Sequence, residues 1–201
     1  MFLDGLGLGA ADRNNPLSAP GSMPLLVQFL KQPLLMDARV ARADVLLKPI
    51  DPTLGVAGLP FRMQYEYEQG EALYWNITGS ARSPIFAEVA GRRLAALSDR
   101  YSATLFECYL CDYAGHAQNQ AQAIEYLQRI DRFLASTIAN LSPSVTLVVT
   151  SDHGNVEDLS TKRHTFNSVP LIAVGPHATD FLSVKDLTGI APQILSLIGS
   201  L

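Results

Sequence analysis

The sequence is poor in charged residues. Only 17% of its 201 residues are Asp, Glu, Lys or Arg, whereas 48% are hydrophobic. This composition is typical of a packed globular protein and argues against a disordered or coiled-coil chain. The formal net charge of −4 provides no basic field for a nucleic-acid backbone, so no nucleic-acid partner is expected. An anionic substrate would need cations held locally, such as metal ions.

Long apolar runs and cysteines are also scarce. No apolar run reaches the length that a bilayer span requires, so no membrane partner is expected. The N-terminus shows no basic region followed by an apolar core, and we therefore expect no signal peptide and a cytoplasmic location. The two cysteines, Cys108 and Cys111, form one CxxC without a second. We interpret them as reduced, buried thiols rather than a zinc or redox site.

Strand-like and helix-like segments alternate along the chain. Apolar or β-branched runs predict strands at residues 1–3, 43–56 (with a turn), 103–110, 144–150 and 169–174. Helical patterns occupy residues 23–31, 84–96 (after an N-cap Ser83), 124–141 and 184–201. This alternation predicts an α/β fold with a mostly parallel central sheet flanked by helices. The length is that of a single domain over residues 1–201.

Carboxylate and imidazole side chains follow three of the predicted strands. Because chemistry in α/β proteins collects beyond the carboxyl ends of strands, we expect these side chains to share one site. A helical turn beginning near residue 112 would place two of them, four residues apart, on one face. Three carboxylates and three imidazoles suffice for two divalent ions, and mixed oxygen and nitrogen ligands favour manganese or zinc over calcium. The six residues are Asp4, Asp112, His116, Asp152, His153 and His164.

Other interpretations of these residues remain open. Asp4 is equally suited to capping its loop, and the Asp152–His153 pair alone could be a capping pair. The glycines from Gly5 to Gly9 have the GxGxG spacing of a nucleotide loop, but no helical pattern follows them, so this hypothesis is weaker. His177, in a Gly-Pro-His turn, is expected to be a bystander.

Four motifs in this order carry a family resemblance: Leu-Asp-Gly-Leu-Gly at 3–7, Asp-Tyr-Ala-Gly-His at 112–116, Ser-Asp-His-Gly-Asn at 151–155 and His-Thr at 164–165. They resemble the alkaline phosphatase superfamily, above all the metalloenzyme domain of cofactor-independent phosphoglycerate mutases and their phosphatase-like relatives. The resemblance implies an alkaline-phosphatase-like sandwich. It also implies a phosphomutase or phosphohydrolase that acts on a small phosphorylated substrate and uses manganese, zinc or magnesium.

The resemblance also implies which residues hold each ion, and it shows one place where this sequence differs from the family pattern. It implies that Asp4, Asp152 and His153 hold one ion, and that the other ion is held by Asp112, His116 and His164. The family has a serine or threonine nucleophile after a lead-in that resembles residues 54–60, but Phe61 follows here. We therefore expect a segment to be missing between Pro60 and Phe61.

Thr78 and Ser80 are poor substitutes for this nucleophile, because no matching lead-in precedes them. On this ground one expectation is that the chain as written is an inactive form of the enzyme. The alternative hypothesis is a non-catalytic metal-binding relative that acts as a binding or scaffold module.

Overall fold

The computed structural model describes residues 1–31, 34–35, 45–50 (backbone) and 64–199. Its strands are β1 (Phe2–Leu3), β2 (Val45–Ile50), β3 (Gly79–Ser80), β4 (Ser83–Pro84), β5 (Glu107–Cys108), β6 (Leu147–Val149) and β7 (Val169–Val174). Its α-helices are α1 (Pro24–Leu30), α2 (Gln64–Glu68), α3 (Ala87–Ser98), α4 (Leu110–Ala117), α5 (Gln120–Asn140) and α6 (Ile190–Ile198). Three short 3₁₀ helices complete the set: η1 (Pro16–Ser18), η2 (Ala178–Ser183) and η3 (Leu187–Gly189).

The sheet pairing is parallel around β1 and antiparallel around β7. Strand β1 pairs in parallel with β5, and Phe2 forms a parallel bridge with Thr150, which directly follows β6. Strand β7 runs antiparallel to both β6 and β2. Two parallel neighbouring strands must be joined by a crossover connection, usually a helix. Residues 150–168, which join β6 to β7, contain no helix, and these two strands are antiparallel. The expected parallel sheet is therefore confirmed in part.

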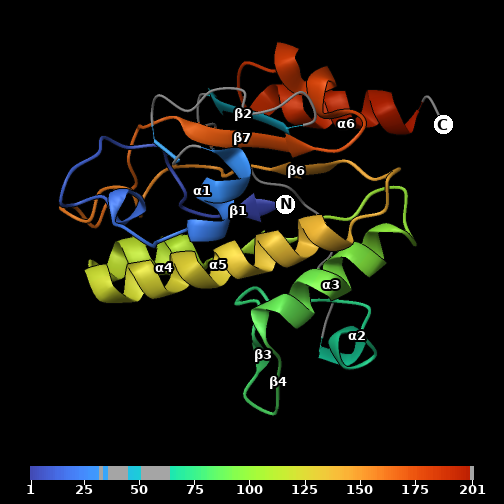
Figure 1. Ribbon diagram of the computed structural model, residues 1–201, viewed down its shortest axis with the longest axis horizontal. Helices are drawn as coiled ribbons and strands as arrows, with labels where there is room; N and C mark the ends of the chain where they lie inside the picture. Colours follow the sequence, from blue (N-terminus) through green and yellow to red (C-terminus); the bar gives the residue numbers. More distant parts are fainter. Residues whose placement is uncertain (32–33, 36–44, 51–63, 200–201) are drawn as a thin grey trace.

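Helices cover both faces of β7 (Figure 1). Ile172 and Val174 belong to a large apolar cluster that includes residues of α3, α4 and α5. The alternate residues Val169, Leu171 and Ala173 belong to a second cluster with η2 and α6. Because successive side chains of a strand point to opposite faces, a strand covered on both sides is apolar throughout. This explains the continuous apolar run at 169–174.

Several predicted element boundaries are wrong. Ser83 and Pro84 do not start a helix but form β4, and the helix begins only at Ala87. In the β3–β4 hairpin, the backbone oxygen of Ser83 accepts a hydrogen bond from Tyr67 Oη at 2.6 Å. The Ser-Pro pair is therefore part of a hairpin and does not cap a helix. The strand predicted at 103–110 pairs only at Glu107–Cys108, since α4 begins at Leu110.

The C-terminal helix is also shorter than predicted. It begins at Ile190, after a 3₁₀ turn whose first amide groups are capped by Asp186, with Thr188 N donating to Asp186 Oδ1 at 2.9 Å. The helices at 23–31 and 124–141 are confirmed as α1 and α5. The predicted strand at 43–56 is confirmed over Val45–Ile50, and its turn lies outside the described residues.

In the described part of the chain, no helix combines the length and apolarity needed to cross a bilayer.

A buried carboxylate fastens α1 to α5. Asp131, 1% exposed, accepts hydrogen bonds from Leu25 N at 2.6 Å and Leu26 N at 2.5 Å, at the N-terminus of α1. The helix has no side-chain cap of its own, because its N-cap position is Met23. Asp131 thus satisfies one buried and one partly buried donor of the first helical turn.

We expect Asp131→Ala to lower the free energy of unfolding by about 2 kcal/mol, because one buried donor and one partly buried donor lose their acceptor. Asp131→Asn, which keeps one carbonyl oxygen, should cost about half as much. Urea unfolding of the three proteins measures this. A loss below about 0.5 kcal/mol for Asp131→Ala would contradict the capping role.

Candidate metal centre

The three parallel segments bring the predicted ligands to one place. Leu3 N donates to Thr150 O at 2.8 Å, which sets β1 beside the segment that enters the Asp152–His153 turn. On the other side, Asp4 N donates to Cys108 O at 2.9 Å, and Asp112 N donates to Asp4 O at 3.0 Å. The backbone pairing therefore holds Asp4 between the start of α4, which follows β5, and the loop that follows β6.

Asp4, Asp152 and His153 form one compact group that could hold a metal ion, each offering a ligand atom within 4.8 Å of the others. His153 Nε2 lies 3.2 Å from Asp4 Oδ1 and 3.6 Å from Asp152 Oδ2. Within the described residues, Asp4 Oδ1 is buried and accepts no hydrogen bond, and its only ion-pair contact is with His153 Nε2. A buried carboxylate oxygen is costly to leave without a hydrogen bond, so this atom fits a metal ligand.

Asp112, His116 and His164 form a second compact group. His116 Nε2 lies 3.3 Å from Asp112 Oδ1, and His164 Nε2 lies 3.4 Å from both of these atoms. Asp112 and His116 are placed together by α4, in which they are four residues apart, as the sequence predicted. His116 Nδ1 lies 2.8 Å from Lys162 O, a contact that leaves Nε2 directed into the group.

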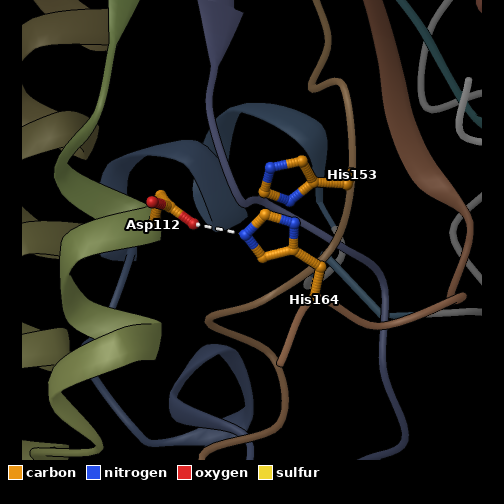
Figure 2. A group of neighbouring side chains, drawn as sticks. All are labelled: Asp112, His153 and His164. Carbon is orange, nitrogen blue, oxygen red and sulfur yellow. Dashed lines mark ion pairs between the residues drawn. The ribbon is translucent and has the colours of Figure 1, made fainter. Parts of the chain in front are cut away.

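His153 links the two groups. Its ring stacks on that of His164, with centroids 3.6 Å apart and planes inclined by 13°. His153, His164 and Asp112 also offer ligand atoms within 4.8 Å of one another. Figure 2 shows these three side chains converging, Asp112 from α4 and the two histidines from the loops after β6. All six predicted residues therefore come together.

Negative charge is concentrated around Asp4. Burial and then the carboxylates of Asp152, Asp112 and Glu107 raise the pKa of Asp4 to about 8. Without a cation, one proton is therefore retained where three carboxylates meet. This is the electrostatic state that a bound divalent ion would relieve.

The raised pKa predicts how pH affects the metal-free protein. A carboxyl with a folded-state pKa near 8 and an unfolded value near 3.8 stabilises the fold below about pH 4 and loses that contribution as pH rises to about 8. In EDTA, the stability of Asp4→Asn relative to the unsubstituted protein should therefore increase between pH 4 and 8. Thermal unfolding at several pH values measures this difference, and a difference independent of pH would refute the assignment.

Two residues of the site were not singled out from the sequence. Asn155 Nδ2 donates to Asp112 Oδ1 at 2.8 Å and so orients a predicted ligand. Glu157, 2% exposed, lies beneath the loops. Both belong to the motif that follows β6, but their residue types are equally common as surface groups. Only their burial distinguishes them.

The structure also bears on the remaining hypotheses, which concern the two cysteines, His177 and the glycine-rich loop. Cys108 and Cys111 are free and buried, and burial raises the pKa of Cys108 to about 12, so neither is a ready thiolate ligand. His177 lies in an exposed turn, with Nδ1 2.9 Å from Asp180 Oδ2, and belongs to neither group. After Gly9 the first helical element is the 3₁₀ turn at Pro16–Ser18, so the nucleotide-loop hypothesis has no helix N-terminus to support it.

The hydroxyl groups of Ser151 and Thr165, in the loops that carry the predicted ligands, already donate hydrogen bonds within the protein. Ser151 Oγ donates to His153 O at 2.8 Å, and Thr165 Oγ1 donates to Glu157. Thr78 and Ser80 belong to the β3–β4 hairpin region, which projects beyond α3 on the side away from β7 (Figure 1). The predicted gap at Pro60 and Phe61, with its lead-in, lies outside the described residues.

Comparison with known proteins identifies the family. The model of the Metalloenzyme superfamily matches residues 85–200, more than half of the chain, and the chain belongs to this superfamily. Five of the six predicted ligands lie within the matched stretch, and Asp4 lies before it.

Similar curated proteins are 2,3-bisphosphoglycerate-independent phosphoglycerate mutases. Those of Halobacterium salinarum and Thermomicrobium roseum are each 35% identical, over 44% and 52% of this chain, and that of Methylobacillus flagellatus is 32% identical over 56%. These alignments cover 19%, 22% and 24% of the respective relatives, so the chain spans about a quarter of their length or less. A solved phosphoglycerate mutase of Leishmania mexicana matches at 21% identity with a TM-score of 0.39, over 44% of this chain and 20% of that one.

Proposed function

We propose that the chain holds two divalent metal ions for phosphoryl transfer to or from a small phosphorylated substrate. Asp4, Asp152 and His153 would bind one ion. The other ion would be bound by Asp112, His116 and His164. Membership of the Metalloenzyme superfamily supports binding of divalent metal, and the number and identity of the ions, manganese or zinc, are part of the proposal.

The observation that carries the proposal is the spacing of the second group. Its three ligand atoms are separated by 3.3, 3.4 and 3.4 Å. Tetrahedral ligands at about 2.0–2.1 Å from a zinc-sized ion lie about 3.3–3.4 Å apart. The side chains of Asp112, His116 and His164 are thus already at coordination distance from one another, and Asn155 holds the carboxylate in place.

Phosphoryl transfer follows from what such a pair of groups can do. Two divalent ions in one site stabilise the attacking and leaving oxygens of a transferring phosphoryl group. The residues of this chain bind and orient the ions, and the stacked pair of His153 and His164 keeps the two groups adjacent. The names of the similar mutases support a phosphorylated three-carbon acid as the substrate class.

A non-catalytic metal-binding relative remains the alternative function, and the comparisons do not favour it because the relatives are named as enzymes. The two functions differ in a simple assay. Hydrolysis of a generic aryl phosphate that depends on added Mn²⁺ would exclude the non-catalytic alternative. No turnover by a protein that retains its ions would support it.

The metal site itself is tested by analysis of protein purified without chelator. We expect more than one ion per chain in the unsubstituted protein, and fewer in Asp152→Ala and in His164→Ala. Unchanged metal content in both variants would refute the two-group assignment.

Three broader predictions accompany this function. We propose that residues 1–201 form one domain with the alkaline-phosphatase-like sandwich, supported by helices on both faces of β7. A cytoplasmic location stays a prediction, supported by the free, buried state of Cys108 and Cys111.

A further inference from the structure

The side chain of Glu157 is a buried hub beneath the metal centre. Glu157 Oε2 accepts hydrogen bonds from Gly7 N at 3.1 Å and Asn155 N at 2.8 Å. Its other oxygen accepts from Thr165 Oγ1 and from Asn167 Nδ2, the latter at 3.2 Å. Within the described residues no ion pair involves Glu157, so four neutral donors from three segments stabilise this carboxylate.

Each of these segments carries a predicted ligand. Gly7 lies three residues after Asp4, and Asn155 lies two residues after His153. Thr165 directly follows His164, and its backbone N donates to Gly154 O at 2.8 Å, which joins the two loops after β6. A single carboxylate therefore connects all three ligand-bearing loops.

Three glycines make room for this carboxylate. A Cβ atom at Gly7 or Gly154 would clash with the carboxylate itself, and one at Gly9 would lie 2.9 Å from Glu157 Cγ. Side chains at these positions would displace Glu157 or separate the loops. Contact with Glu157 thereby explains Gly7 and Gly9, and Gly5 faces the backbone of Asp112, so the glycine-rich stretch needs no nucleotide phosphate to account for it.

The fourth ligand-bearing element is reached through Asn155. The backbone of Asn155 donates to Glu157, and its side chain donates to Asp112 Oδ1 at 2.8 Å on α4. Asn155 is completely buried, and its Oδ1 packs where a Cβ at Gly115 would clash. Displacement of Glu157 would therefore also shift Asn155 and, through its side-chain hydrogen bond, the carboxylate of Asp112.

We propose that Glu157 is a positioning residue that sets the ligand loops at coordination distance from one another and thereby determines metal affinity. This inference rests on the proposed metal site. Glu157 lies beneath the ligands and is not itself counted among them. Partners that orient metal ligands affect affinity about 10–100-fold when they are changed, and Glu157 acts on three loops at once.

The test compares Glu157→Gln with Glu125→Gln, which changes an exposed carboxylate on α5. The amide of Glu157→Gln keeps the volume but presents N–H groups to two of the four donors. We expect its Mn²⁺ affinity, measured by calorimetry, to fall about 10–100-fold. The ion count at saturating Mn²⁺ should stay that of the unsubstituted protein, and the visible spectrum of bound Co²⁺ should change. Glu125→Gln should match the unsubstituted protein in all three measurements.

The outcomes separate this inference from the proposed function. If the unsubstituted protein binds no Mn²⁺, the proposed function fails and this inference falls with it. If it binds Mn²⁺ and Glu157→Gln binds equally tightly with an unchanged Co²⁺ spectrum, only this inference is overturned, and Glu157 has a purely structural role. Should Glu157→Gln not fold, Thr165→Val removes one donor and is expected to weaken Mn²⁺ binding by up to about 10-fold, and unchanged binding would overturn the inference.

Discussion

Removal of divalent metal by EDTA is expected to lower the midpoint of thermal unfolding by roughly 10 °C for each ion lost. A ligand present at about 1,000 times its Kd stabilises the folded state by about 4 kcal/mol. In a chain of this size, about 1 kcal/mol shifts the midpoint by roughly 2–4 °C. Asp4 Oδ1, which is buried and accepts no hydrogen bond, and the clustered carboxylates make the metal-free state costly here. Differential scanning fluorimetry in EDTA, followed by excess Mn²⁺, measures the loss and its recovery.

Calcium is the matched control for this experiment. Three of the six proposed ligands are imidazoles, and Ca²⁺ prefers oxygen ligands in larger number. Excess Ca²⁺ should therefore restore much less of the lost stability than Mn²⁺ or Zn²⁺. A midpoint that responds to none of these treatments would contradict the presence of a metal centre.

His153→Ala is expected to lose metal from both groups, so that fewer than one ion per chain remains. The imidazole of His153 lies 3.2 Å from Asp4 Oδ1, and its ring supports that of His164 at a centroid distance of 3.6 Å. Truncation would remove a ligand from one group and the stacking partner from the other. His116→Ala removes a ligand from one group only and should retain about one ion, because the group of Asp4, Asp152 and His153 keeps all of its ligands. Mass-spectrometric metal analysis of Mn²⁺-loaded, desalted protein gives these counts.

His177→Ala is the control for histidine removal as such. Its side chain is exposed and pairs with Asp180 in η2, apart from both groups. It should retain the full metal content. Equal metal loss in His177→Ala and His153→Ala, or full retention in His153→Ala, would show that His153 does not join the two groups.

Much of the site was predictable because it depends on residue type at strand ends. Asp112 and His116 could be placed together by helical spacing, and α4 confirms this spacing. The convergence of all six residues followed from the rule that strand carboxyl ends share an edge. The helix start at Ser83 was wrong, because a local capping signal did not reveal the tertiary contact with Tyr67.

The direction of β7 also could not be predicted from the local sequence pattern. Its run of apolar residues is the same for a parallel and an antiparallel strand buried on both faces. The direction is decided by the connection from β6, which carries the ligand loops instead of a crossover helix.

The sequence by itself determined which chemistry is available: three carboxylates and three imidazoles that follow predicted strands. Only the tertiary structure decided how these groups meet. Asp4 and Asp152 are far apart in the chain, and the hydrogen bonds of β1 to both neighbouring segments bring them together. The position of Glu157 likewise depends on glycines far away in sequence, because a buried carboxylate must find its donors wherever the fold supplies them.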